Sequence, residues 1–405
     1  MRTSLTLALL TAASCSWAQA LLWTGACNNL DRDAYAVVFN GAGTKLLSGS
    51  ECPQARIRVW DAASGNLDWD YQVSNSLMCL VGVSFSSNGD YFATTEEMGN
   101  LLIFDNTGAS PVLTHAIDLG VSMSNSLDFS PDGSKVAMDG SDGAVRIYDV
   151  GSGSLLSTIT ASASAIRSVD WSPNGAFIAT GGQDGTPRLW DAATGSLLHA
   201  FVSTTVPIAS VRVSADNSLL VVAKSNGAIH VYDVATHSQI ALLSTGSTVH
   251  QADISDDNAW IVTGRNGQAR AYSLPSGAQF AAFNSSPASS TVYSVDIQPG
   301  GTKVAIGNSN GDVAVFELAA ILAVEDGLRL ALTFDLLSNV VDDALIVRAE
   351  DGAAREYAVF GTNGALHAHG TWTGQPIDVS GLAPGAYLLR MRGAGTQGAR
   401  QFIKR

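Results

Sequence analysis

The stretch SVDWSPNGAFIATGGQDGTPRLWDAATGSLLHAF, residues 168–201, carries the pattern that decides the fold. It reads as four short runs of alternating apolar and polar residues, which is the pattern of half-buried β-strands. The first two runs are joined by the turn-forming segment SPNG that starts at Ser172, and the second and third by Asp184-Gly185, a strong hairpin signal. The stretch therefore predicts a four-stranded antiparallel sheet.

The same unit recurs along the chain. Its third run is found in IRVWDAASG (57–65), LLIFDNTG (101–108), VRIYDVGSG (145–153), PRLWDAATG (187–195), IHVYDVATH (229–237), ARAYSLPSG (269–277) and VAVFEL (313–318). The aromatic residues of these segments, Trp60, Phe104, Tyr148, Trp190, Tyr232, Tyr272 and Phe316, are spaced 44, 44, 42, 42, 40 and 44 residues apart. A period of about 40 to 45 residues with four strands per unit is typical of a β-propeller. Seven units predict an all-β, seven-bladed propeller over residues 21–318.

The aromatic residue is followed by aspartate in five units, Trp60-Asp61, Phe104-Asp105, Tyr148-Asp149, Trp190-Asp191 and Tyr232-Asp233, and by Ser273 or Glu317 in the last two. At these residues the chain resembles the WD-repeat family. The Gly-His dipeptide that this family often places before the first strand is absent. The resemblance therefore implies a ring in which the family's buried His–Ser–Asp–Trp hydrogen-bond relay is incomplete and apolar packing between blades contributes more of the stability.

Two ways of closing the ring are open. Leu21-Leu22-Trp23-Thr24 precedes the first inner strand much as Leu67-Asp68-Trp69-Asp70 precedes the second, so the N-terminus can supply the outer strand of blade seven beside Asp312 to Glu317. Alternatively, Ala319 to Val324 completes that blade from its own sequence. We favour the N-terminal closure, which removes an exposed sheet edge.

The charge balance excludes some partners. The formal net charge is −14 and only 14% of residues are charged. Residues 21–318 hold 27 acidic and 13 basic residues, and their field repels nucleic acid and anionic lipid headgroups. No later segment has 18 uninterrupted apolar residues, so we expect no membrane span. Nucleic acid is not an expected partner.

Residues 1–20 predict an exported protein. Arg2, the apolar run from Leu5 to Ala13 and the small-x-small ending at Ala18 to Ala20 form a secretory signal peptide, with cleavage expected after Ala20. Beyond it stand three cysteines, for which an oxidising compartment permits one disulfide. We expect Cys27–Cys52, which would pin the closing strand to blade one, with Cys52–Cys79 as the rival pairing.

No cofactor or metal is expected. The cysteine spacing matches no zinc site, and strings such as Asp132-Gly133-Ser134 recur at turn positions without the full calcium loop and its terminal glutamate. Most aspartates of the ring are therefore interpreted as turn formers.

A second module follows the ring. From about Glu325 the 42-residue period stops, and shorter strand-like runs separated by Gly, Asn and Pro predict a small Ig-like β-sandwich over residues 325–405. Its closing pattern, IDVSGLAPGAYLLRM (377–391) followed by the terminal QFIKR, resembles the C-terminal sorting domain of the type IX secretion system of Bacteroidota. The Asn-Pro motif that usually opens such domains is missing, since Val340 follows Asn339.

The residues that carry this second resemblance form two groups. They are Asp378, Leu382, Gly385 and Tyr387 in the first, and the basic end with Lys404 and Arg405 in the second. The resemblance implies passage of the folded protein through the outer membrane, removal of this module, and release or attachment of the rest at the cell surface. A plain Ig-like accessory domain is the alternative.

The candidate binding residues lie just before the inner strands of the ring. The equivalent positions are Tyr35, Val81, Asn125, Arg167, Ala209, His250 and Tyr293. This row is too mixed to hold a metal, but Tyr and Arg supply much of the energy in protein contacts. We predict a rim that docks a protein or peptide through Tyr35, Asn125, Arg167, His250 and Tyr293, unless the row is merely tolerated surface.

The sequence therefore predicts a secreted or cell-surface binding scaffold that is not an enzyme, since the ring holds no catalytic motif such as G-x-S-x-G or H-E-x-x-H. Two alternatives remain open. One is a propeller hydrolase with an aspartate site in the channel, and the other is a structural or adhesive surface protein.

Overall fold

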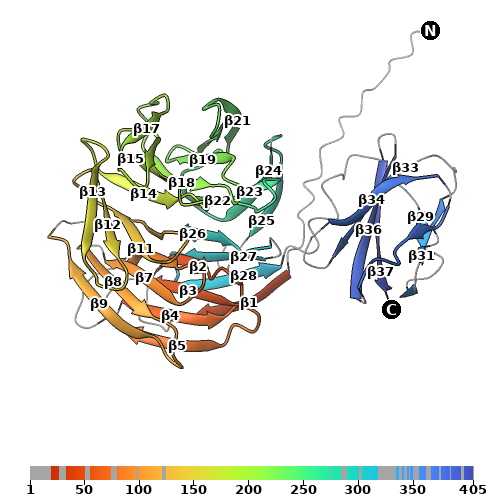
Figure 1. The fold of residues 1–405 in the computed structure, drawn as a ribbon, viewed down its shortest axis with the longest axis horizontal. Helices are drawn as coiled ribbons and strands as arrows, with labels where there is room; N and C mark the ends of the chain where they lie inside the picture. The colour runs from red at the N-terminus through yellow and green to blue at the C-terminus, as the bar shows by residue number, and fades with distance from the viewer. Residues whose placement is uncertain are drawn as a thin grey trace, which may run out of the picture.

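Seven four-stranded antiparallel sheets form a closed ring in the computed structural model (Figure 1). The structure describes residues 20–26, 33–50, 55–73, 80–96, 99–120, 125–274, 276–283, 290–300 and 303–317 of this ring. In the C-terminal module it describes residues 334–336, 340–341, 344–345, 347–349, 355–361, 366–373, 375–383, 385–393 and 396–404. The seven-bladed propeller predicted from the repeat is confirmed.

Each blade has an inner strand at the channel and a second strand beside it. The inner strands are β2 (Ala34–Phe39), β6 (Leu80–Phe85), β10 (Leu127–Phe129), β14 (Ile166–Trp171), β18 (Ile208–Val213), β22 (Val249–Ile254) and β26 (Val292–Ile297). The second strands are β3 (Lys45–Ser50), β7 (Tyr91–Glu96), β11 (Lys135–Asp139), β15 (Phe177–Gly182), β19 (Leu219–Lys224), β23 (Trp260–Arg265) and β27 (Lys303–Asn308). We call the end of the ring at which the inner strands begin the upper face, and the opposite end the lower face.

The third and outer strands complete each blade. The third strands are β4 (Arg56–Asp61), β8 (Asn100–Asp105), β12 (Ala144–Asp149), β16 (Arg188–Asp191), β20 (Ala228–Asp233), β24 (Ala269–Ser273) and β28 (Asp312–Glu317). The outer strands of blades one to six are β5 (Leu67–Gln72), β9 (Val112–Asp118), β13 (Leu155–Thr160), β17 (Leu197–Ala200), β21 (Gln239–Ser244) and β25 (Gln279–Phe283).

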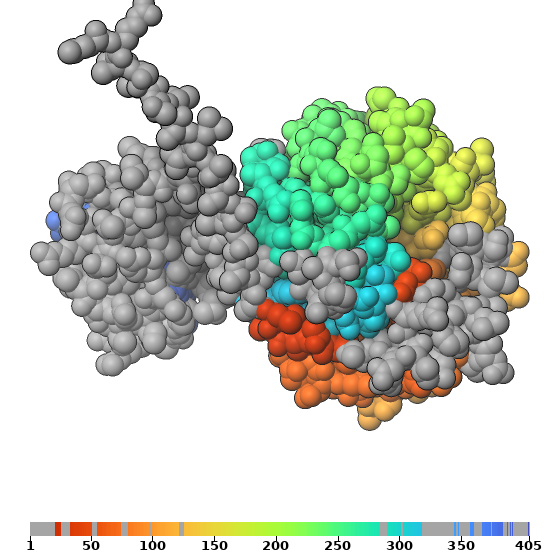
Figure 2. Space-filling view, turned by 180° about the vertical axis from the view of Figure 1, so that it is seen from behind, coloured from red at the N-terminus to blue at the C-terminus, as the bar shows by residue number. Residues whose placement is uncertain are grey.

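The N-terminal strand closes the ring, as predicted. β1 (Ala20–Ala26) pairs antiparallel with β28, from Ala20 beside Glu317 to Ala26 beside Asp312. Figures 1 and 2 show this first strand, in red, against the cyan last blade. Every blade therefore has four strands.

The closing strand is anchored through Trp23. Its indole Nε1 donates a 3.1 Å hydrogen bond to the carbonyl oxygen of Ala62, and its ring lies 6.0 Å from that of Trp60, centroid to centroid. Gly65 makes room for it: this residue has φ of 73°, and a Cβ there would lie 2.5 Å from the Trp23 ring. The anchor therefore ties blade seven to blade one.

Apolar side chains fill the space between neighbouring blades. Phe92 and Phe104 stack 4.9 Å apart, and Trp69 packs edge-on against both rings. The relay of the WD-repeat family survives in part, since Trp60 Nε1 donates to Ser48 Oγ at 2.8 Å and Trp190 Nε1 to Thr180 Oγ1 at 2.9 Å. Apolar packing and these two buried bonds act together.

The C-terminal module is also built of strands. They are β29 (Phe334–Leu336), β30 (Val340–Val341), β31 (Ala344–Leu345), β32 (Val347–Ala349), β33 (Arg355–Gly361), β34 (Leu366–Trp372), β35 (Ile377–Asp378), β36 (Gly385–Gly393) and β37 (Thr396–Lys404). A five-stranded sheet has the order β30-β37-β36-β33-β34, and β29–β32 and β31–β35 form two short pairs. Val359, Trp372, Ile377, Leu389 and Met391 are among its buried core residues.

Some sequence predictions lie outside the described residues. These are the signal peptide up to residue 19 and the three cysteines Cys27, Cys52 and Cys79 with their disulfide. In the part of the chain that the structure describes, no helix is long and apolar enough to cross a membrane.

We predict that Trp23→Ala lowers the free energy of unfolding by about 2–4 kcal/mol, because it removes a half-buried indole, its hydrogen bond and the anchor of the closing strand. Urea denaturation followed by intrinsic fluorescence measures the change. Leu22→Ala is the control, since Leu22 is 41% exposed on the same strand and its truncation leaves stability nearly unchanged. Equal losses for both variants would contradict a specific role of Trp23.

Candidate functional site at the upper face and the channel

The predicted rim residues divide into two arcs on the upper face. Tyr35, Tyr293 and His250 belong to blades one, seven and six, which are consecutive around the closed ring. Their rings meet: the centroids of Tyr35 and Tyr293 are 4.7 Å apart, and those of His250 and Tyr293 are 5.3 Å apart. We call these three residues the aromatic arc.

The second arc is polar. Asn125 and Arg167 stand on the neighbouring blades three and four, separated from the aromatic arc by Val81 on one side and Ala209 on the other. The structure therefore brings three of the five predicted residues into direct contact and leaves the other two across the ring.

Hydrogen bonds hold the aromatic arc in place. His250 Nε2 lies 2.9 Å from Asn266 Oδ1, which requires the proton on Nε2. Asn266 belongs to the Asn-Gly turn between the second and third strands of blade six, and its Oδ1 also accepts from Thr291 Oγ1 at 3.5 Å. A hairpin turn of the upper face thus orients the imidazole beside Tyr293.

The polar arc is positioned by its backbone. The amides of Asn125 and Ser126 donate to Asp139 Oδ1 at 2.8 and 3.1 Å, which fixes the chain just before β10. Arg167 is exposed, one residue into β14, where its neighbours Ile166 and Ser168 are buried. The upper face therefore offers half-buried aromatic rings and one exposed guanidinium, a combination suited to contacts with another molecule.

Below the rim, two rows of side chains join the inner strands of blades three to seven and of blade one to their neighbours. In the first row the backbone amides of Val169, Val211, Ala252, Val295 and Val37 donate to Ser126, Ser168, Ser210, Gln251 and Ser294 of the preceding blade, at 2.9 to 3.2 Å. In the second row the amides of Trp171, Val213, Ile297 and Phe39 donate to Asp128, Asp170, Asp253 and Asp296, at 2.6 to 2.8 Å. These bonds span the blade boundaries of the inner ring.

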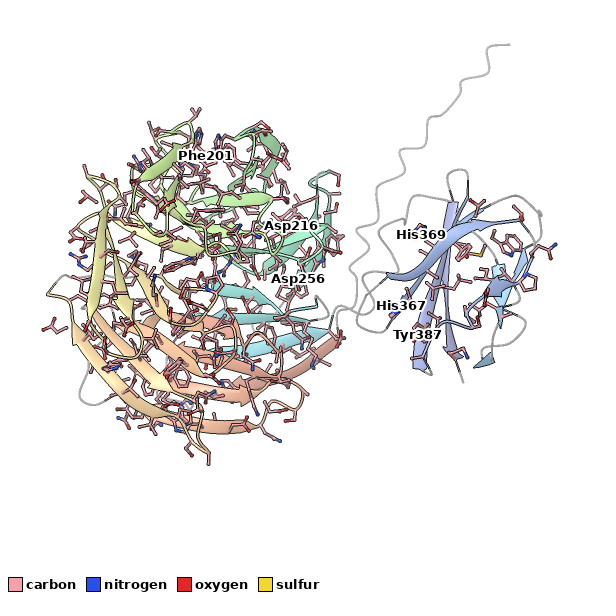
Figure 3. All side chains as sticks on the ribbon, in the orientation of Figure 1. Phe201, Asp216, Asp256, His367, His369 and Tyr387 are labelled. Carbon is pink, nitrogen blue, oxygen red and sulfur yellow. The ribbon has the colours of Figure 1, made fainter. Side chains whose placement is uncertain are left out.

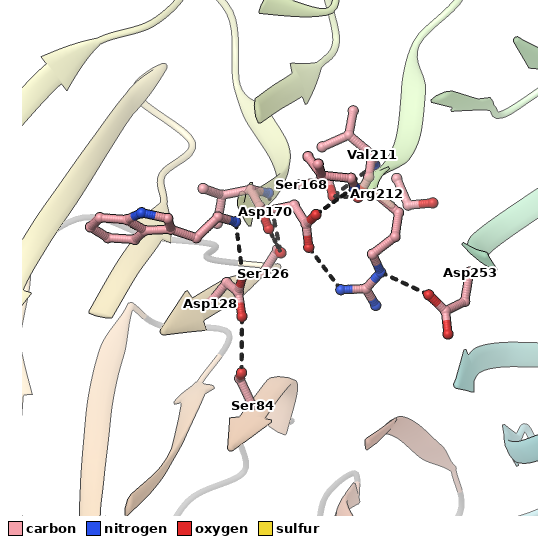
Figure 4. A network of polar contacts seen from close by, with 12 residues as sticks. Ser84, Ser126, Asp128, Ser168, Asp170, Val211, Arg212 and Asp253 are labelled. Atoms are coloured by element: carbon pink, nitrogen blue, oxygen red, sulfur yellow. Dashed lines mark hydrogen bonds and ion pairs between the residues drawn. The ribbon is translucent and has the colours of Figure 1, made fainter. Parts of the chain in front are cut away.

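Arg212 occupies the aspartate position of blade five. Its Nη1 lies 2.9 Å from Asp170 Oδ1 and its Nε 3.2 Å from Asp253 Oδ1, so it bridges the blades on either side (Figure 4). Blades one and two have Val38 and Ser84 at the equivalent position, and Ser84 Oγ donates to Asp128 Oδ1 at 3.2 Å. The row therefore holds four carboxylates and one guanidinium.

Burial controls the ionisation of this row. Desolvation raises the pKa of all four carboxyl groups, and raises that of Asp170 to about 7 although Arg212 opposes the shift. The pKa of Asp296 is raised further by the neighbouring Asp253. Burial lowers the pKa of Arg212, but the surrounding carboxylates outweigh this effect and raise it. Part of the row is therefore protonated near neutral pH.

This chemistry serves the ring itself. One oxygen of each carboxylate accepts a backbone amide of the next blade, and no group of three His, Cys, Asp or Glu side chains among the described residues is placed to hold a metal. The sequence analysis missed these four aspartates by interpreting the aspartates of the ring as turn formers. The overlooked signal is their constant place directly before the last residue of the inner strand, as in Val169-Asp170-Trp171.

Many of the other aspartates do form turns. Asp191 Oδ1 accepts from the amide and hydroxyl of Thr194 at 2.7 and 2.8 Å, and Asp61, Asp105, Asp149 and Asp233 make the same pair of bonds with a nearby Ser or Thr. On the lower face Asp216 accepts from Asn258 and Asp256 from the Gly300 amide, each across a blade boundary (Figure 3).

Two segments of the ring match a known family model. Residues 115–149 and 153–191 match the WD domain, G-beta repeat. The matched segments contain the Trp190–Thr180 bond and end at Asp149 and Asp191, and the other blades of the ring have the same four-stranded plan. No curated protein matches the chain.

In the C-terminal module, the predicted sorting residues take part in the fold. Tyr387 is buried, and its hydroxyl donates a 2.9 Å hydrogen bond to the carbonyl oxygen of Ala383, four residues earlier. Leu382 packs on the core, and Asp378 Oδ1 accepts from the Ser380 amide at 2.9 Å. Asp378, Leu382 and Tyr387 therefore each have a structural contact within the module.

The start of β36 pairs with the end of β37. Gly385 begins β36 opposite Lys404, which is 7% exposed, whereas Arg405 lies outside the described residues. His367 and His369 are exposed on β34, and the His367 ring meets Tyr387 edge-on at 5.4 Å (Figure 3).

We predict that Asp296→Asn stabilises the protein at pH 8 by about 1 kcal/mol or more and has little effect at pH 4, close to the ordinary pKa of an aspartate. The raised pKa means that folding takes up a proton, so the wild-type carboxyl costs stability progressively as pH rises above its ordinary pKa of 3.8. Asparagine keeps an oxygen for the Phe39 amide without the charge. Thermal melting at the two pH values measures the difference.

Asp191→Asn provides the opposite control. Hydrogen bonds from Thr194 lower the pKa of Asp191, so its stabilising effect is present at neutral pH and is lost only as the carboxylate protonates in acid. This variant is therefore expected to melt earlier than the wild type at pH 8. If Asp296→Asn also melts earlier at pH 8, the interpretation of the aspartate row is wrong.

Proposed function

We propose that the chain is an exported, non-catalytic binding scaffold whose upper face docks a protein or peptide. A WD-repeat propeller points to a protein-interaction scaffold in general. The observation that carries the specific proposal is the aromatic arc, in which half-buried aromatic side chains from three blades are held together on the upper face of the propeller.

The arc suits docking because its side chains are already held in place before a partner binds. Tyr293 packs between Tyr35 and His250, and the Asn266 turn orients the imidazole, so few side-chain rotations are lost when a partner binds. Arg167 on the far side of the channel mouth adds a hydrogen-bonding group that can engage a carboxylate or a backbone carbonyl.

We predict that the double variant Tyr35→Ala, Tyr293→Ala captures at least about tenfold less partner than the wild type, because aromatic hot spots are each worth about 2 kcal/mol or more. Proteins captured by the immobilised full chain from the medium and surface of producing cells are quantified by mass spectrometry. Arg167→Ala, tested separately, is expected to weaken capture less.

Val112→Ala is the matched control for this experiment. Val112 is 61% exposed on the outer strand of blade two, away from the inner-strand starts. Melting curves establish that all variants remain folded. Unchanged capture by the double tyrosine variant would refute the upper-face assignment.

We also propose that residues 325–405 direct export through the type IX secretion system, and that the remaining chain is released or attached at the outer surface. Support comes from the motif of Asp378, Leu382, Gly385 and Tyr387 and from the paired basic end at Lys404. Because local folding uses the same residues, the test must separate folding from sorting.

A reporter protein carrying a signal peptide and residues 325–405 is expected to reach the medium or cell surface of a Bacteroidota strain with a working type IX system. The same reporter in a strain that lacks the system is expected to stay in the periplasm, as measured by fractionation and immunoblotting. Tyr387→Phe removes only the hydroxyl bond to Ala383 and monitors folding. Export from both strains would contradict a sorting role.

A further inference from the structure

Acidic residues are distributed unevenly around the upper face. Blades one to four and blade seven each hold at least one at this end, namely Asp33, Glu96, Asp139, Asp142, Asp184 and Asp312. The upper-end sequences of blades five and six, residues 207–210, 223–229, 243–251, 264–270 and 282–291, hold no Asp or Glu. Their hairpin turns read Asn-Gly, where blades three and four have Asp-Gly. In a chain with a net charge of −14, two neighbouring blades therefore present an upper end without acidic side chains.

Two buried cations occupy the same part of the ring. Lys224 ends β19 of blade five and Arg265 ends β23 of blade six. Each donates to a main-chain oxygen of the preceding blade, Lys224 Nζ to Gly185 at 2.7 Å and Arg265 Nη1 to Thr245 at 2.6 Å. Arg265 Nε is buried and meets no acceptor among the described residues. Both side chains are thus held by carbonyl groups, and neither forms an ion pair within the described part of the chain.

The positive charge persists at neutral pH. Burial lowers the pKa of Lys224 to about 8, although Asp184 opposes this shift, so the ammonium group stays mostly protonated at pH 7. Asp184 is itself paired with Arg188 at 2.8 Å and accepts from Ser162 Oγ at 3.0 Å. Its carboxylate therefore balances the charge of Lys224 only in part.

Arg167 projects from the adjacent blade four. The pairing of β14 with β15 passes from Ile166 beside Gly182 to Ser168 beside Gly181, so Arg167 is the extra residue of a β-bulge. Bulges re-aim side chains near the ends of sheets. The Arg167 side chain is exposed and forms no ion pair with the described residues. We call Arg167, Lys224 and Arg265, on three consecutive blades, the cationic sector.

The aspartates of the lower face do not cancel the field of this sector. β19 separates Lys224 from the acidic turn at Asp216, and a strand of six residues is about 20 Å long. Exposed charges farther apart than the Debye length, about 8 Å at physiological ionic strength, are largely screened from each other. An anion that approaches the upper face at Arg167 therefore meets a locally positive surface.

We propose that the segment bound on the upper face is an acidic peptide whose carboxylate pairs with Arg167 in the cationic sector. This inference rests on the proposed function and names the chemistry of the bound segment. A guanidinium can hold a carboxylate through two parallel hydrogen bonds, while Lys224 and Arg265 add positive potential from beneath. His250 joins the sector to the aromatic arc, since it lies on blade six as Arg265 does. The bound segment therefore combines a carboxylate with an apolar or aromatic side chain.

The test is retention of short synthetic peptide libraries on the immobilised full chain, quantified by mass spectrometry. All libraries share the same randomised apolar and aromatic positions. Three have an amidated C-terminus and differ in their fixed positions, which are aspartate, asparagine or lysine. A fourth has asparagine and a free C-terminal carboxylate, which separates an acidic side chain from a chain end as the source of the anion. We expect one or both carboxylate libraries to be retained at least about fivefold more than the amidated asparagine library, and to lose this advantage in high salt.

Arg167→Gln is expected to remove this preference and to leave retention of the amidated asparagine library unchanged. Arg146→Gln is the matched control, because it makes the same substitution at an upper-end arginine that is already paired, with Asp142 of blade three. Its preference is expected to match the wild type. Melting curves verify that both variants are folded.

Equal retention of the aspartate, asparagine and free-carboxylate libraries by the wild type overturns the inference, as does a preference for lysine or retention of none of the libraries. An unchanged preference in Arg167→Gln overturns it as well. Failure of the proposed function has a different signature, in which the Tyr35→Ala, Tyr293→Ala variant retains every library as well as the wild type does.

Discussion

The hydrogen bond from an inner-strand amide to a serine or aspartate of the preceding blade is the interaction on which this ring depends. Each inner strand borders the channel and pairs with a strand of its own sheet on one side only. Its amides on the channel side therefore lack partners within that sheet, and a buried amide without an acceptor is costly. The contacts Val211–Ser168 and Val213–Asp170 show how one blade supplies acceptors for the next. The last such bonds run from Phe39 and Val37 back to blade seven, so the row crosses the junction of blades seven and one that β1 closes from outside.

The same interaction explains why the channel is acidic without being an evident catalytic centre. A carboxylate accepts a backbone amide strongly, but removing it from water raises its pKa, as at Asp170 and Asp296. Arg212 offsets part of this cost by bridging Asp170 and Asp253, and it does so from the one blade of this run that lacks the aspartate. Protonation provides the rest of the compensation. Charge in the channel is therefore balanced by structure.

Repeats and turns were predictable from the sequence because they depend on local chemistry. The aromatic period, the Asn266-Gly267 hairpin and the Asp191–Thr194 turn all follow from residues close in the chain. The aspartate row was not predicted, because its acceptors matter only once two blades stand side by side. Likewise the row of rim residues was visible, but the meeting of Tyr35 with Tyr293 follows from ring closure, which joins residues 258 positions apart. Tyr387 shows the reverse problem, since a residue that the sequence singles out for its resemblance to a sorting domain also has a local structural role in its bond to Ala383.

Departures from the repeat are the best guide to what individual blades do. The turn before β21 has His237 with φ of 59° where the equivalent turns have Gly65, Gly153, Gly195 and Gly277. A non-glycine residue in this conformation is disfavoured, and here the stack on His199 compensates by joining blades four and five. The aromatic arc departs in the same sense, because Val81 and Ala209 at equivalent positions offer no aromatic ring. The two departures occupy different blades and different surfaces of the ring.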